Sequence, residues 1–156
     1  MASSVDKILL GKVALITGGS RGIGRAIAAA YTKAGARVFI CGRNSADVED
    51  ALRQIRAQGG SIDGVAGDIS RAPDARRIVR AALERYGVID VLVNNASILG
   101  PREVIAEYPL EAWEEVIHIN LTGLFLMTHE VLPEMLARQS GSIINVTSGV
   151  GRSGKA

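Results

Sequence analysis

Short apolar runs that favour strands alternate along this chain with longer segments of helical periodicity, and this alternation constrains the fold more than any other feature. Strands are expected at 13–17, 37–42, 61–66, 89–93 and 141–146, with helical patterns between them. Strands that are apolar without alternation are buried on both faces, as in a parallel sheet covered by helices. Because crossover connections are right-handed, the pattern predicts an α/β fold with a doubly wound parallel sheet of five strands, helices on both faces, and a ligand crevice at the carboxyl ends of the strands.

The helical segments carry recognisable boundary residues. Asn44 or Ser45 is suited to cap the second helix, and Pro73 suits the first turn of the third. The fourth pattern is the longest and predicts one helix over Leu110–Ala137. Between 116 and 127 this helix is apolar around nearly its whole circumference, and such a helix is buried on every side. One of its faces can pack on the sheet, so another face needs a second cover.

Composition excludes several classes of protein. At 156 residues, with 47% apolar and 22% charged side chains, the chain has the make-up of one globular domain, which we expect to span residues 1–156. Its 18 basic and 16 acidic residues form no basic stripe, which argues against nucleic-acid binding. The single cysteine, Cys41, excludes a disulfide framework and a multi-cysteine zinc site, and we expect no metal.

Hydrophobic stretches along the chain are short. None approaches the ~20 residues that a membrane helix needs. The first dozen residues also lack the long apolar run of a signal peptide. We therefore expect a cytoplasmic protein with no membrane partner.

A glycine-rich octet, residues 17–24, stands between the first strand and the first helix. Gly18 can take the tight turn, Gly22 leaves room for a phosphate, and Gly24 lets the helix approach the sheet. The helix amino terminus then offers free N–H groups and a positive dipole end to an anion. The alternative is a glycine turn without a ligand, but the strand before it and the helix after it favour a dinucleotide. The expected contacts are Gly18, Ser20, Arg21, Gly22, Ile23 and Gly24.

The octet resembles the T-G-x-x-x-G-x-G turn of the short-chain dehydrogenase/reductase family, and further motifs resemble that family in the same order. Asp68 matches its adenine-contacting acid, and residues 94–97 (Asn-Asn-Ala-Ser) resemble its N-N-A-G element with serine in place of the last glycine. Asn120 and Ser148 match its catalytic asparagine and serine. The resemblance implies a Rossmann-like coenzyme-binding fold, and a homo-oligomer that forms through the long helix Leu110–Ala137. It also adds coenzyme contacts from Asp68, Ile69, Asn94 and Ala96.

Each of these residues also has a plainer interpretation. Asp68 could cap the segment that follows it, and Asn94 could belong to a turn. Asn120 lies on the apolar stripe of the long helix, where a buried amide must find partners, so it is either a structural clamp or a functional group. Ser148 could be a solvated serine at a strand end.

The end of the second strand bears on the choice of coenzyme. Sites for NAD usually place an acid there, on the ribose 2′-hydroxyl, whereas this sequence has Arg43 and Asn44. Together with Arg21 in the glycine turn, two guanidinium groups can converge on a 2′-phosphate. Two solvated surface arginines are the alternative. We predict NADP as the cofactor, with NAD the weaker candidate.

The resemblance also implies a Y-x-x-x-K pair that this sequence does not contain. In the family the tyrosine exchanges the substrate proton beside the serine, and the lysine lowers its pKa. The tyrosines here are Tyr31, Tyr86 and Tyr108, and none is followed four positions later by lysine. We therefore expect a C-terminally incomplete dinucleotide-binding domain that is inactive alone.

The function implied is hydride transfer between NADP(H) and a small-molecule carbonyl or alcohol substrate. The alternative is a non-catalytic dinucleotide-binding module that ends at Ala156. The last eight residues, 149–156, also match G-x-x-x-x-G-K, but alanine stands where a P-loop needs serine or threonine for magnesium, so we expect no NTPase.

Overall fold

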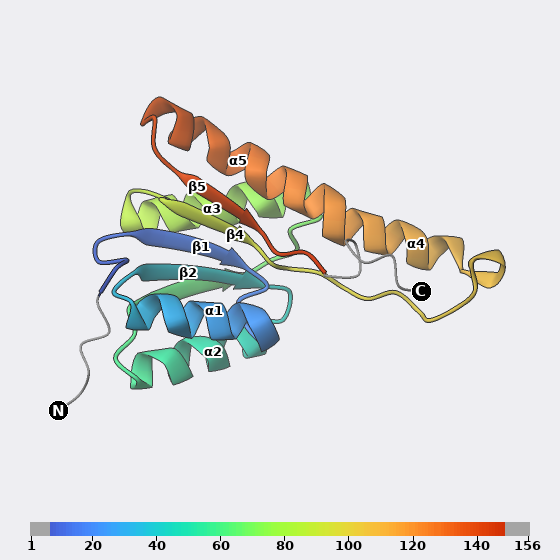
Figure 1. Ribbon diagram of the computed structural model, residues 1–156, viewed down its shortest axis with the longest axis horizontal. Coiled ribbons are helices and arrows are strands. Elements are labelled where there is room, and N and C mark those ends of the chain that lie inside the picture. The colour runs from blue at the N-terminus through green and yellow to red at the C-terminus, as the bar shows by residue number, and fades with distance from the viewer. Residues whose placement is uncertain (1–6, 149–156) are drawn as a thin grey trace.

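Five parallel strands form one sheet at the centre of the protein, in the order β3-β2-β1-β4-β5 (Figure 1). The strands are β1 (Val13–Thr17), β2 (Arg37–Gly42), β3 (Ile62–Ala66), β4 (Val91–Asn94) and β5 (Ser142–Asn145). The structure, a computed structural model, describes residues 7–148. The predicted doubly wound sheet is confirmed. The P-loop-like segment 149–156 lies outside the described residues.

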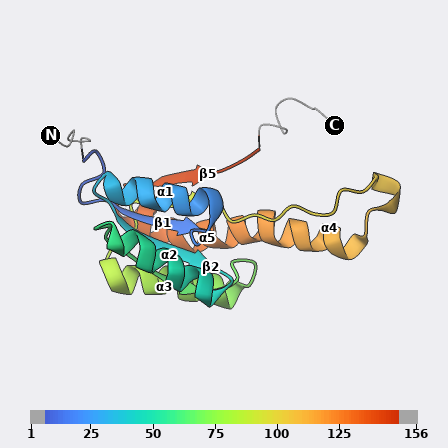
Figure 2. The same cartoon turned by 90° about the horizontal axis from the view of Figure 1, so that it is seen from below.

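Helices cover both faces of the sheet (Figure 2). They are α1 (Gly22–Lys33), α2 (Ser45–Ala57), α3 (Ala72–Tyr86), α4 (Leu110–Ile117) and α5 (Gly123–Ala137). A π-helical turn, His118–Thr122, joins α4 to α5, so the predicted long helix has its expected outer bounds and one unexpected interruption. A short 3₁₀ turn, Ile105–Glu107, precedes α4. Figures 1 and 2 both show α4 and the loop before it projecting beyond the sheet.

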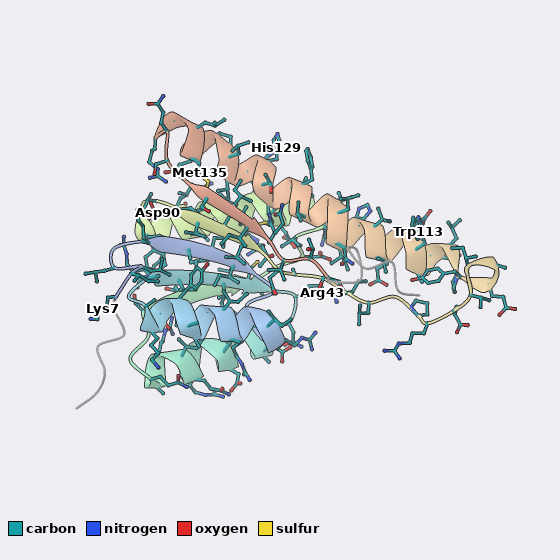
Figure 3. All side chains as sticks on the ribbon, in the orientation of Figure 1. Lys7, Arg43, Asp90, Trp113, His129 and Met135 are labelled. Atoms are coloured by element: carbon teal, nitrogen blue, oxygen red, sulfur yellow. The ribbon has the colours of Figure 1, made fainter. Side chains whose placement is uncertain are left out.

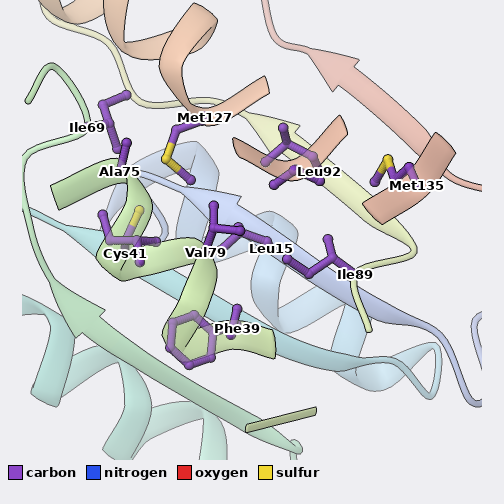
Figure 4. Close-up of a cluster of buried hydrophobic side chains, with 13 residues drawn as sticks. Leu15, Phe39, Cys41, Ile69, Ala75, Val79, Ile89, Leu92, Met127 and Met135 are labelled. Carbon is purple, nitrogen blue, oxygen red and sulfur yellow. The ribbon is translucent and has the colours of Figure 1, made fainter. Parts of the chain in front are cut away.

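Two apolar clusters fill the space between the layers. On one face, α1 and α2 pack against the side chains of β1 and β2 that include Ile16 and Ile40. On the other face, α3 and α5 pack against Leu15, Phe39 and Leu92 (Figure 4). Successive residues of β1 thus serve opposite clusters, because side chains alternate across a strand. All five residues of β1 are buried as a result.

Local chemistry sets several of the helix ends. The side chain of Asn44 accepts a hydrogen bond of 3.1 Å from the backbone N–H of Asp47, so Asn44 is the N-cap of α2. A proline stands in the first turn of α3, where its missing N–H costs nothing. Gly87 ends α3 in the left-handed conformation, with φ of 77°.

The long helix is covered on one side only by the described residues. Met127, Val131 and Met135 of α5 are buried against the sheet and α3. Large apolar side chains elsewhere on α4, α5 and the π turn are exposed, which are Leu110, Trp113, Leu121, Phe125, Leu132 and Leu136. The expectation that one face packs on the sheet and another needs a second cover agrees with these exposures among residues 7–148.

Candidate coenzyme pocket

A pocket of about 250 Å³ opens at the carboxyl ends of the parallel strands. This is where ligands bind in open α/β sheets, because the helices that follow the strands begin there. The glycine turn after β1 forms one wall, and the segments after β2, β3 and β4 form the others. The lining residues are Gly18, Ser20, Arg21, Ile23, Gly24, Cys41, Gly42, Arg43, Asn44, Asp47, Gly67, Asp68, Ile69, Asn95, Ala96, Ser97, Ile98 and Ile119.

The pocket gathers most of the residues that the sequence marked for coenzyme binding. Of those predicted contacts, only Gly22 and Asn94 are absent from the lining. The two predicted catalytic residues, Asn120 and Ser148, are also outside it. Asn120 nevertheless follows the lining residue Ile119 directly.

The glycine turn has the backbone geometry that the pattern requires. Gly18 has φ of +64°, a conformation that L side chains rarely adopt. At Gly24, an added Cβ would lie 2.2 Å from the carbonyl oxygen of Gly18 and 2.5 Å from the side-chain nitrogen of Asn95. A methyl group at Gly24 would therefore push the start of α1 away from the turn. The turn and the helix amino terminus meet at the distance that only glycine permits.

Hydrogen bonds tie the ends of β1 and β4 together beneath the pocket. The hydroxyl of Thr17 accepts bonds of 3.0 Å from the backbone N–H groups of Asn95 and Ala96, and donates one of 3.4 Å to the Val93 carbonyl. The amide nitrogen of Asn95 donates to the carbonyls of Thr17 and Gly18, at 3.0 and 3.3 Å. Thr17 and Asn95 thus fix the position of the glycine turn against the neighbouring strand. Thr17 belongs to the glycine-rich octet and Asn95 to the 94–97 motif, but the sequence did not reveal the hydrogen bonds between them.

Asn94 lies under the pocket rather than on its surface. It is only 4% exposed, and its amide nitrogen donates to the Thr128 hydroxyl at 3.1 Å and to the Asn145 side-chain oxygen at 3.0 Å. Its own side-chain oxygen is buried and finds no hydrogen-bond partner among the described residues. In this structure Asn94 links α5, β4 and β5.

Asn120 sits in the π turn and clamps the loop that follows β4. Its side-chain oxygen accepts a bond of 2.8 Å from the Ile98 backbone N–H, and its nitrogen donates one of 2.9 Å to the Ile98 carbonyl. The amide is half-buried rather than buried as expected, and these two bonds give the clamp interpretation a defined geometry. π turns in proteins also occur often at functional sites. Ser148 is exposed and follows β5 by three residues, at the same end of the sheet.

Asp68 stabilises the segment after β3 and also lines the pocket. Its carboxylate accepts bonds from the backbone N–H and the hydroxyl of Ser70, at 3.0 and 2.7 Å. Its backbone N–H donates to the Asp74 carboxylate at 3.0 Å, and this bond holds the pKa of Asp74 below its usual value. The capping role and a place in the pocket wall are therefore compatible.

Two arginines and two carboxylates stand near the mouth of the pocket. Arg21 approaches Asp47 of α2 at 3.8 Å, and Arg43 approaches Glu115 of α4 at 3.8 Å. Figure 3 shows Arg43 at the carboxyl end of the sheet. The sequence indicated no carboxylate at the end of β2, and the residues that directly follow β2, Arg43 and Asn44, do not supply one. The fold brings Asp47 there from the first helical turn and Glu115 from a distant helix.

The remaining chemistry around the pocket is limited. Cys41 is fully buried, and this burial raises the pKa of its thiol from 9.0 to about 12. Among residues 7–148, no group of three histidine, cysteine or acidic side chains could hold a metal ion. In that same part of the chain, no helix is both long and apolar enough to cross a membrane.

Comparison with known proteins places these features in context. A family profile described as short chain dehydrogenase matches residues 12–156. A short chain dehydrogenase/reductase of Macrophomina phaseolina, dpmpG, is 36% identical over 157 residues, which covers 98% of this chain and 90% of that protein. A 3-oxoacyl-acyl-carrier-protein reductase of Synechocystis is 40% identical, covering 94% of this chain and 59% of its own length.

Solved structures give the same result. A crystal structure of actinorhodin polyketide ketoreductase with NADPH superposes with a TM-score of 0.89 at 41% identity, covering 93% of this chain and 56% of that one. The chain spans about half the length of most of the curated relatives that it matches.

Proposed function

Because the chain belongs to the short-chain dehydrogenase family, we propose that it is the coenzyme-binding region of an NADP(H)-dependent oxidoreductase. The reaction is hydride transfer between the coenzyme and the carbonyl or alcohol carbon of a small molecule. The observation that carries the proposal is the pocket at the carboxyl ends of the strands, with a glycine turn on one side and two arginines at its mouth.

The residues of the pocket fit a dinucleotide. The close approach at Gly24 leaves a cradle that a Cβ would fill, at the amino terminus of α1. Free backbone N–H groups and the helix dipole at that position favour binding of the pyrophosphate. This binding does not require a side chain at Gly24. Asp68 and Ile69 stand where the segment after β3 would flank the adenine. When bound, the coenzyme supplies the hydride; the protein supplies position and charge.

Arg21 and Arg43 are the groups that we assign to the 2′-phosphate. Both line the pocket, and their side chains are 77% and 50% exposed, so they are free to turn toward an anion. Planar guanidinium groups bind phosphate with paired hydrogen bonds. The similarity to a ketoreductase solved with NADPH supports the same coenzyme.

The substrate carbonyl would lie beyond the pocket, near Asn120 and Ser148. We assign the substrate oxygen to the Ser148 hydroxyl, and a water of the proton relay to Asn120. The names of similar proteins, a 3-oxoacyl reductase and a polyketide ketoreductase, favour a ketone in an acyl chain as the substrate class. A proton donor is still required, and no tyrosine in this sequence is followed four positions later by lysine. We therefore propose that the 156-residue chain binds coenzyme without turnover.

The exposed apolar side chains of α4 and α5 support the proposal of a homo-oligomer through Leu110–Ala137. Large contiguous apolar patches on soluble proteins usually mark interfaces.

Fluorescence titration of the purified chain with NADPH and NADH tests the coenzyme assignment. We expect tighter binding of NADPH, and we expect Arg43→Asp to erase or invert the preference by repelling the 2′-phosphate. Arg80→Asp, the same substitution on the outer surface of α3, is the matched control and should leave the preference unchanged. Equal affinities of the parent chain for both nucleotides would overturn the two-arginine assignment.

A second measurement tests whether the chain alone can catalyse the reaction. Carbonyl reduction by the isolated chain with NADPH should be undetectable, because a positioned acid–base group contributes about 10²–10⁴-fold in rate. Robust turnover by protein of verified mass would show that the acid–base group lies among the residues present.

A further inference from the structure

Each arginine assigned to the 2′-phosphate has a carboxylate beside it. Arg21 of the glycine turn lies 3.8 Å from Asp47, and Arg43 lies 3.8 Å from Glu115. The two acids come from the first turn of α2 and from α4, so three segments of the chain contribute these charges: the glycine turn, the stretch from the end of β2 into α2, and α4. The formal charges of the four side chains sum to zero. The pocket mouth is therefore less positive than the two arginines alone imply.

Such acids could act in either of two ways on a phosphate. They could hold the guanidinium groups in position and so strengthen binding, or they could repel the phosphate and weaken it. The geometry decides between these effects. Both pairs lie close to the 4.0 Å limit of an ion pair, and all four side chains are at least 40% exposed. Exposed pairs of this kind restrain side chains weakly. Repulsion of a doubly charged phosphate therefore outweighs any gain from orientation.

We propose that Asp47 and Glu115 are specificity-determining residues that keep the preference for NADPH over NADH small. The inference rests on the proposed function, because it concerns the same pocket. Asp47 has the larger effect, since it lines the pocket and its side chain is 40% exposed, against 61% for Glu115. An acid in the pocket wall also offers an acceptor to the 2′-hydroxyl of NADH, which an amide offers less well.

Neutral isosteres test the proposal by binding alone. In Asp47→Asn, the ratio of the NADH to the NADPH dissociation constant should rise about 3- to 10-fold, as expected for removing one charge close to a phosphate near the surface. Glu115→Gln should raise the ratio about 2- to 3-fold, because its side chain is more exposed. For both variants the change should come mainly from tighter NADPH binding, and it should shrink as salt is raised.

Matched controls lie on the same helices. Asp50→Asn removes an acid one turn further along α2, which pairs with Arg25 and Arg53 and does not line the pocket. Glu114→Gln removes the neighbour of Glu115 on α4. Both controls should leave the ratio within about 1.5-fold of the parent value, since more distant exposed charges are screened.

The outcomes distinguish failure of this inference from failure of the proposed function. A raised ratio for Asp47→Asn, with unchanged controls, supports the inference. An unchanged or lowered ratio, in a variant whose circular dichroism and melting match the parent, overturns it and leaves the proposed function standing. Failure of the parent chain to bind either nucleotide overturns the proposed function and this inference with it.

Discussion

β1 and β5 belong to the same sheet, yet their surroundings differ as much as two strands can. β1 is paired on both edges and covered on both faces, and every one of its residues is buried. β5 is an edge strand, and all but one of its residues are exposed. Exposed apolar side chains occur on β5, at Ile144, and separately on α4 and α5, where they include Trp113 and Phe125. The glycine turn thus follows the better-covered of the two strands.

The comparison predicts a large difference between core truncations in the two strands. Leu15→Ala, in the fully buried β1, should lower the free energy of unfolding by about 2–5 kcal/mol. Ile144 of β5 is 40% exposed, so Ile144→Ala should cost no more than about 1 kcal/mol. Urea denaturation of both variants measures the difference. Equal losses would show that β5 is as well packed as β1.

The hydrogen bonds of Thr17 beneath the pocket can be tested by a polar-to-apolar substitution. Thr17→Val keeps the shape of the side chain but leaves two backbone N–H groups, of Asn95 and Ala96, without their acceptor. Both donors are only part-buried, so each should cost the lower part of the about 1–3 kcal/mol of a buried donor without a partner. We expect a loss of about 2–4 kcal/mol in stability and weaker coenzyme binding. Thr17→Ser retains the hydroxyl and should recover most of both. A Thr17→Val variant as stable as Thr17→Ser would contradict the role of these bonds.

Burial of the Cys41 thiol predicts a pH effect that belongs to the enclosed region. Because burial raises the pKa of this thiol from 9.0 to about 12, its contribution to stability is fully present below pH 9. Above pH 9 the unfolded chain loses the proton while the folded chain keeps it, so stability falls as pH rises toward 12. The slope contributed by this one group approaches about 1.4 kcal/mol per pH unit.

Comparison with Cys41→Ala isolates the thiol from the other groups that titrate in this range. The variant should be less stable at pH 8 but should lose less stability between pH 9 and pH 11. Parallel pH profiles for the two proteins would show that the thiol ionises freely in the folded state.

The smallest effect on stability is expected on the exposed helix. Phe125 is 59% exposed, so Phe125→Glu should change the unfolding free energy of the monomer by less than about 0.5 kcal/mol. Its effect should instead appear in the association state, because the substitution places a charge in the exposed apolar surface of α5. Light scattering after size-exclusion chromatography measures this, with Glu84→Lys on α3 as the surface-charge control. A parent chain that is already a stable monomer would contradict the proposed homo-oligomer.

The parts of the fold that follow from local sequence were predictable. The bounds of β1 and β2, the cap at Asn44 and the outer limits of the long helix all agree with the structure. The π turn at 118–122 was not, because its composition is the same as that of the α-helix around it. β4 begins at Val91 rather than Ile89, since the apolar pattern does not record where pairing with β1 starts.

The candidate site likewise has residues that local sequence predicts and residues that it does not. The glycine turn and Arg43 are contiguous with their motifs, so spacing alone located them. Asp47 and Glu115 escaped notice because each becomes relevant only when the chain folds back on itself. The bonds of Asn120 to Ile98 likewise join segments 22 residues apart in the sequence.

The bond between Asn94 and Asn145 has a consequence for how the sheet is assembled. The two residues occupy the same register position of β4 and β5, and the bond joins their side chains. A shift of β5 by one residue would place an aliphatic side chain, Ile144 or Val146, beside the buried amide and would reverse which face each residue presents. The misaligned sheet would then enclose an amide with one fewer acceptor. The bond therefore discriminates between the correct and the slipped pairing of a strand whose apolar packing is limited to the half-buried Ile143.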